Sequence, residues 1–73
     1  MNEKEFIEFM MDLTDTEMTL TMDTLLKDVE EWDSLSFVSF QANARVKNGL
    51  VVSPSDVKNA KTVRDLFVLM SKG

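Results

Sequence analysis

The residues best suited to chemistry stand together near the middle of the chain, in the run EEWDSLSF at positions 30–37. The only Trp, Trp32, is followed there by an Asp–Ser pair, Asp33 and Ser34. A serine hydroxyl can act as a hydrolase nucleophile or receive a phosphate-linked group. No histidine occurs in the chain and no Gly-x-Ser-x-Gly turn surrounds Ser34, so a hydrolase nucleophile is not expected.

The composition excludes several other classes of function. The chain has 73 residues, enough for a single domain over 1–73, and it has neither cysteine nor histidine. Thiol nucleophiles, zinc thiolate sites and the commonest general base are therefore absent, and we expect a protein that is not an enzyme and has no metal site. A net charge of −5 argues against nucleic acid as the main partner.

The charge is unevenly distributed along the chain. Residues 1–33 contain eleven acidic and two basic side chains, whereas residues 34–73 contain two acidic and six basic ones. The beginning of the chain is acidic, unlike a secretory signal, and no apolar run is long enough to span a membrane. We expect a monomeric protein of the cytoplasm that lacks a membrane span.

Helical patterns flank a long irregular segment in the first half of the chain. Residues 3–13 place apolar side chains at helical spacing, and Asn2 can cap that helix. Residues 14–33 are rich in Thr and Asp, which favour turns, yet apolar residues are scattered through them. The sequence predicts a long loop pinned to the core, with a short helical turn near residues 23–28.

Three further helices are predicted in the second half. The second covers residues 34–48 and ends before Gly49, which suits a left-handed conformation. Residues 50–52, LVV, are interpreted as a buried loop. A short third helix runs from an N-cap at Ser53 to about Asn59. The fourth starts at TVRD, which resembles a capping box, has a stripe of Val63, Leu66, Phe67 and Met70, and ends at Lys72 and Gly73.

The second helix has two apolar faces. Leu35, Val38, Ala42 and Val46 fall within one sector of the helix, whereas Phe37, Phe40 and Ala44 fall on the opposite side. The aromatic side is expected to face the core, because burial of a Phe side chain is worth about 2–3 kcal/mol. The other side is then either an exposed docking surface or enclosed by the remaining helices, and spacing alone leaves both open.

The Asp–Ser pair also has two interpretations. Either residue caps a helix well, so DS before an apolar helix needs no further function. If Asp33 is the N-cap, Ser34 is the first helical residue and its hydroxyl is free to point outward. The amide groups and the dipole at that end of the helix favour negative charge, as on a phosphate-linked group.

The run EEWDSLSF, preceded by an amphipathic helix and a long loop and followed by SPSDV and KTVRDL, resembles the acyl carrier protein family. The resemblance covers roughly residues 3–71. It implies an all-α, four-helix acyl-carrier-like bundle, with three longer helices, a short third helix and a long loop between helices 1 and 2. It also implies that Ser34 carries a 4′-phosphopantetheine arm, with Asp33 as its motif neighbour and helix cap, and that Leu35, Val38 and Ala42 form the partner-docking face.

The resemblance further implies a function and a group of partners. The protein would hold an acyl or aminoacyl group as a thioester on the arm, in lipid or secondary metabolite biosynthesis. Its partners would be a phosphopantetheinyl transferase, a loading ligase for acyl or aminoacyl groups, and a downstream acyltransferase or synthase. One departure is that the second helix has no acidic residue after Asp33, whereas recognition helices of the family are usually acidic.

Two alternatives stay open beside the carrier interpretation. In the first, the chain shares the carrier fold without being modified and acts only as a helical protein-interaction module. In the second, the chain is an unrelated small helical protein in which Ser34 does no more than begin a helix.

Overall fold

A computed structural model describes residues 2–71, and these residues form an all-helical structure. The helices are α1 (Glu3–Thr14), the 3₁₀ helix η1 (Leu26–Asp28), α2 (Ser34–Asn48), α3 (Pro54–Asn59) and α4 (Val63–Ser71). Within this part of the chain there is no β-strand, only an isolated bridge between Leu25 and Thr62. The predictions of an all-α fold, a short third helix and a helical turn in the long loop are confirmed.

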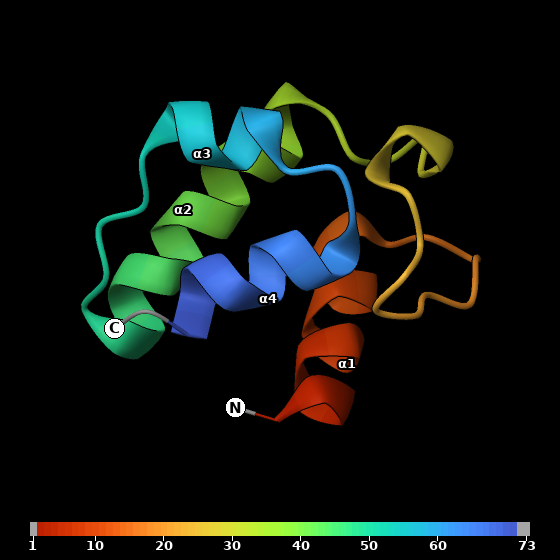
Figure 1. The fold of residues 1–73 in the computed structure, drawn as a ribbon, viewed down its shortest axis with the longest axis horizontal. Helices are drawn as coiled ribbons and strands as arrows, with labels where there is room; N and C mark the ends of the chain where they lie inside the picture. The colour runs from red at the N-terminus through yellow and green to blue at the C-terminus, as the bar shows by residue number, and fades with distance from the viewer. Residues whose placement is uncertain (1, 72–73) are drawn as a thin grey trace.

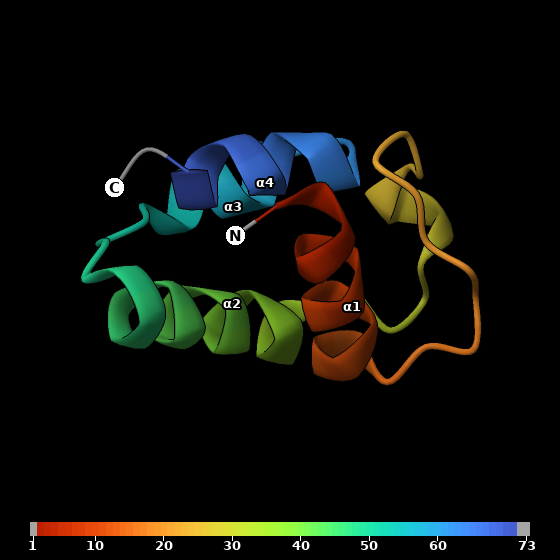
Figure 2. The ribbon, with the colours of Figure 1, turned by 90° about the horizontal axis from the view of Figure 1, so that it is seen from below.

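The helices are arranged around one shared core (Figures 1 and 2). Helix α2 contacts α1 and α3, and α4 contacts α1. Figure 2 shows α2 on one side of the molecule and α3 with α4 on the other, while α1 runs from one side to the other. None of the helices within residues 2–71 is long and apolar enough to cross a membrane.

The helix ends follow local signals in the sequence. Asn2 caps α1 as predicted, and Glu5 completes a capping box, with the Glu5 N–H donating to Asn2 Oδ1 at 2.8 Å. Helix α2 ends at Gly49, whose φ of 63° is left-handed. Ser53 is the N-cap of α3, but its side chain makes no capping hydrogen bond. The predicted end of the last helix at Lys72 and Gly73 lies outside the described residues.

Helix α4 begins with the predicted capping box. Asp65 Oδ2 accepts hydrogen bonds from the N–H groups of Lys61 (2.9 Å) and Thr62 (3.2 Å), and the Asp65 N–H donates to Thr62 Oγ1 (3.3 Å). The backbone N–H groups of Lys61 and then Thr62 hold the pKa of the Asp65 carboxyl below its ordinary value, because they stabilise the charged form. Ionised Asp65 therefore stabilises the start of α4.

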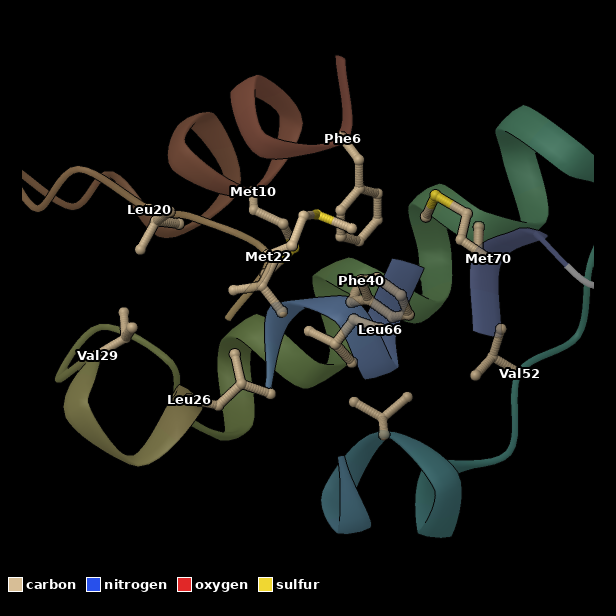
Figure 3. Close-up of a cluster of buried hydrophobic side chains, with 13 residues drawn as sticks. Phe6, Met10, Leu20, Met22, Leu26, Val29, Phe40, Val52, Leu66 and Met70 are labelled. Atoms are coloured by element: carbon tan, nitrogen blue, oxygen red, sulfur yellow. The ribbon is translucent and has the colours of Figure 1, made fainter. Parts of the chain in front are cut away.

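The long loop between α1 and α2 is part of the core (Figure 3). Four of its apolar side chains are buried, namely Leu20, Met22, Leu26 and Val29. Backbone hydrogen bonds fix it to the start of α4: the Arg64 N–H donates to the Met22 carbonyl at 2.9 Å, and the Leu26 N–H donates to the Lys61 carbonyl at 2.8 Å. The prediction of a pinned loop is confirmed, although Leu25 is exposed.

Aromatic rings from three helices meet at the centre of the core. Phe6 of α1 and Phe40 of α2 are both fully buried, with ring centroids 6.4 Å apart in an edge-to-face arrangement. Phe67 of α4 lies 5.3 Å from Phe6 in a similar geometry. These contacts hold α1, α2 and α4 together and fix which face of α2 points inward.

The interpretation of residues 50–52 as a buried loop is wrong for one of the three. Val52 is buried and Leu50 is half-buried, whereas Val51 is 82% exposed. Leu50 and Val52 contact the core, and Val51 between them points away from it. The connector between α2 and α3 therefore presents one valine to solvent.

Candidate functional site

The N-terminus of α2 is built around Asp33. Asp33 is the N-cap residue, and its Oδ1 accepts a hydrogen bond from the Ser36 N–H at 3.1 Å. The Phe37 N–H donates to the Asp33 carbonyl at 3.0 Å and closes the first helical turn. Because the carboxylate of Asp33 serves the cap, the residue that follows it has no capping role.

Ser34 is the first residue of α2, and it is exposed. Within residues 2–71 its hydroxyl has no hydrogen-bond partner. Its neighbour Leu35 is 77% exposed, so the surface beside the hydroxyl is apolar and accessible. An enzyme can therefore reach the Ser34 hydroxyl without any rearrangement of the helix.

Ser36 has a different environment from Ser34. It is buried, with 7% of its surface exposed, and its Oγ donates to the Glu31 carbonyl at 2.6 Å. The same Oγ lies 3.4 Å from Asp33 Oδ1. The Ser36 side chain turns back to bind the loop that precedes the helix. Ser36 thus fixes the segment that leads into Ser34.

The tryptophan before the cap packs onto the helix that it precedes. Trp32 is half-buried, and its ring centroid lies 5.0 Å from that of Phe37 and 6.2 Å from that of Phe40. Trp32 precedes the cap and Phe37 is the fourth helical residue, which is the spacing of a hydrophobic staple. This contact sets the direction in which the chain enters α2, and hence the position of Ser34.

Sequence reasoning missed both the staple and the Ser36 bond. The staple has a local signal, an apolar residue at the position before the cap and another at the fourth helical position, as in Trp32 and Phe37. The bond from Ser36 to Glu31 has no such signal, since serine is equally common on exposed helix faces.

The two apolar faces of α2 have different environments. Phe40 and Ala44 are fully buried and Phe37 is half-buried, so this face points into the core. On the opposite face, Val38 is 63% exposed and Ala42 is exposed. Helical spacing left two possibilities for this face, an exposed surface or a face enclosed by the other helices. The structure shows an exposed surface, because the described helices and loops do not enclose the face that carries Leu35, Val38 and Ala42.

The chemistry available at this end of α2 is limited. The described residues contain no group of three or more carboxylates arranged to hold a metal ion. What the site offers is an accessible hydroxyl at the positive end of a 15-residue helix, beside an apolar surface. The site thus combines an accessible hydroxyl oxygen with a place that favours negative charge.

No protein-family model matches this chain, and comparisons with curated proteins and with solved structures find no significant match.

Proposed function

We propose that this protein is a carrier that holds an acyl or aminoacyl group as a thioester on a 4′-phosphopantetheine arm attached to Ser34. The observation that carries the proposal is the exposed Ser34 hydroxyl at the first position of a helix that Asp33 caps. The order of the helices, the long loop before α2 and the six-residue α3 support it, since they agree with the acyl-carrier-like bundle that the sequence resembles.

The attachment reaction would take place in a partner enzyme. A phosphopantetheinyl transferase brings coenzyme A and Mg²⁺ to Ser34, and the Ser34 oxygen attacks the phosphorus that bears the pantetheine arm. A new P–O bond forms, the pyrophosphate bond of coenzyme A breaks, adenosine bisphosphate leaves and the hydroxyl proton passes to the transferase. The arm provides the thiol that this cysteine-free chain lacks.

The protein contributes position and recognition. The bonds of Asp33 and Ser36 and the packing of Trp32 hold the start of α2 in one geometry, so the arm would leave the surface at a fixed place. The exposed face with Leu35 and Val38 would receive the transferase, the loading ligase and the downstream acyltransferase or synthase in turn. Exposed apolar patches of this kind mark sites of protein–protein interaction.

The experiment is intact-mass spectrometry after incubation with coenzyme A and a broad-specificity transferase. We expect addition of one phosphopantetheine to the wild type and none to Ser34→Ala. Ser39→Ala is the matched control, because Ser39 is also an exposed serine of α2 and its loss should leave the addition unchanged. Failure of several transferases to modify the wild type would contradict the proposal.

One observation also favours a second function, an unmodified protein-interaction module. The exposed apolar face of α2 would suit docking whether or not an arm is attached. The same mass measurement separates the two functions, because the module requires no addition at Ser34.

A further inference from the structure

Exposed apolar side chains gather on α2 and the connector that follows it. Among the large apolar residues in the described part of the chain, the four with the highest exposure are Val46 (84%), Val51 (82%), Leu35 (77%) and Val38 (63%). All four belong to residues 34–53. Such a concentration in a small protein is typical of a surface that a partner covers.

A groove lies within this surface. It has a volume of ≈ 310 Å³, with Val38, Ala42 and Arg45 of α2 on one side and Leu50 and Val51 of the connector on the other. Figure 2 shows how the connector leaves the end of α2 and turns towards α3. The volume is sufficient for one large apolar side chain of a partner.

The walls of the groove are held in place before any partner arrives. Gln41 Nε2 donates a hydrogen bond to the Val52 carbonyl at 3.0 Å, which ties the connector to the middle of α2. Val52 itself is buried in the core. A preformed groove binds with a smaller loss of conformational entropy than a mobile one.

The charges around the groove differ from those of the rest of the molecule. Arg45 is the one charged residue among the described residues that line the groove, whereas Asp56 lines an adjoining hollow together with Leu50, Val51 and Val52. The second base of α2, Lys47, lies on the side of α1, with its Nζ 5.8 Å from the centre of the Phe9 ring. Eleven of the thirteen acidic residues belong to residues 1–33. A carboxylate of a partner would therefore be attracted to Arg45 at this groove.

The groove and Ser34 lie along the same side of α2. Ser34, Val38, Gln41 and Arg45 follow the spacing i, i+4, i+7 and i+11, which places them on one helix face. At 1.5 Å per residue, Val38 and Arg45 are about 6 and 16 Å along the axis from Ser34. A protein bound in the groove would thus lie beside any group attached to Ser34.

We propose that this groove docks partner proteins through one large apolar side chain that is flanked by carboxylates. This inference rests on the proposed carrier function, because it specifies the side chains that a partner would present to the docking face of α2. Arg45 would pair with a carboxylate of the partner at the rim, while Val38, Ala42 and Val51 would surround the apolar side chain.

The test is a selection from a displayed library of short helical peptides, each with one Leu or Phe and randomised charged residues around it. We expect peptides enriched on the wild type to carry Asp or Glu beside the apolar residue. In ¹⁵N NMR titrations, an enriched peptide should shift the resonances of Val38, Ala42 and Val51. Arg45→Glu should weaken binding about fivefold at low salt, whereas Lys4→Glu, the same charge change on exposed α1, should not.

Several results would overturn the proposal: enrichment of basic peptides, no enrichment at all, shifts confined to another surface such as that around Val68, or equal effects of Arg45→Glu and Lys4→Glu. Mass spectrometry of the same samples keeps the two proposals apart. Peptide binding without modification of Ser34 would support the groove and count against the carrier function. Modification of Ser34 without peptide binding would overturn the groove alone.

Discussion

The side chain of Asp33 should stabilise the protein measurably, whereas the side chain of Ser53 should not. Both residues are N-caps, of α2 and α3 respectively, but only Asp33 makes a capping hydrogen bond. Loss of a capping side chain costs about 0.5–2 kcal/mol of unfolding free energy, and a carboxylate at a helix N-terminus contributes about 0.3–1 kcal/mol through the helix dipole.

Asp33→Ala removes the 3.1 Å bond from the Ser36 N–H, the longer 3.4 Å bond from Ser36 Oγ, and the charge at an exposed position. We therefore expect a loss of about 1–1.5 kcal/mol of unfolding free energy, near the middle of the range for caps. Asp33→Asn retains an acceptor and loses only the charge, so about 0.5 kcal/mol is expected. In a domain of this size each kcal/mol corresponds to a fall in Tm of about 4–8 °C.

Urea unfolding followed by Trp32 fluorescence measures the difference, since the half-buried indole becomes exposed on unfolding. Ser53→Ala is the matched control and should change the unfolding free energy by less than about 0.5 kcal/mol. If Ser53→Ala costs as much as Asp33→Ala, the cap geometry at α2 does not determine the stability of that helix, and the reasoning fails.

Three further substitutions test the loop, the core and the start of α4. Ser36→Ala should cost about 1 kcal/mol, because it removes the 2.6 Å bond to the Glu31 carbonyl from a buried position; an unchanged urea midpoint would refute this. Phe40→Ala should lower the unfolding free energy by about 3–5 kcal/mol, because Phe40 is fully buried. The total unfolding free energy of a chain of this length is roughly 4–11 kcal/mol. A loss below about 1 kcal/mol would be inconsistent with the full burial of Phe40. The pKa of the Asp65 carboxyl is lower in the folded protein than in the unfolded chain, where it is near 4. The stabilisation by the Asp65 carboxylate is therefore fully present above the unfolded-state pKa and is lost as the pH falls through the folded-state pKa. Unfolding midpoints from pH 7 to about pH 2 should therefore fall less steeply for Asp65→Asn than for the wild type, while Glu8→Gln on the exposed side of α1 should keep the wild-type slope.

Much of the fold follows from local signals. The bounds of α2 are marked by Asp33, which can accept from the first turn, and by Gly49, which adopts a left-handed φ without strain. The start of α4 is marked in the same way by Thr62 and Asp65. These are interactions within four residues, and they depend little on the rest of the chain.

The contacts that were not predicted join distant segments. The bridge between Leu25 and Thr62, and the bond from the Leu26 N–H to the Lys61 carbonyl, depend on how the loop packs against α4. Neither sequence segment carries a pattern that specifies the other. The exposure of Val51 likewise follows from the path of the connector, because its residue type alone favours burial.

At the candidate site, helical spacing predicts the two faces of α2. Capping preferences alone left the choice of cap between Asp33 and Ser34 open, and the structure assigns it to Asp33. The sequence does not predict the burial of Ser36, since a serine in the first turn can point outward or back to the loop. Trp32 and Phe37 show that a known pattern was present and was overlooked.

The central claim is that the Ser34 hydroxyl receives a phosphopantetheine arm. The most direct test is fragmentation mass spectrometry of the peptide that contains residues 30–45, taken from protein treated with coenzyme A and a phosphopantetheinyl transferase. The account predicts that the added mass is located on Ser34 and on neither Ser36 nor Ser39. An adduct on another residue, or a peptide that stays unmodified with every transferase tried, would contradict it.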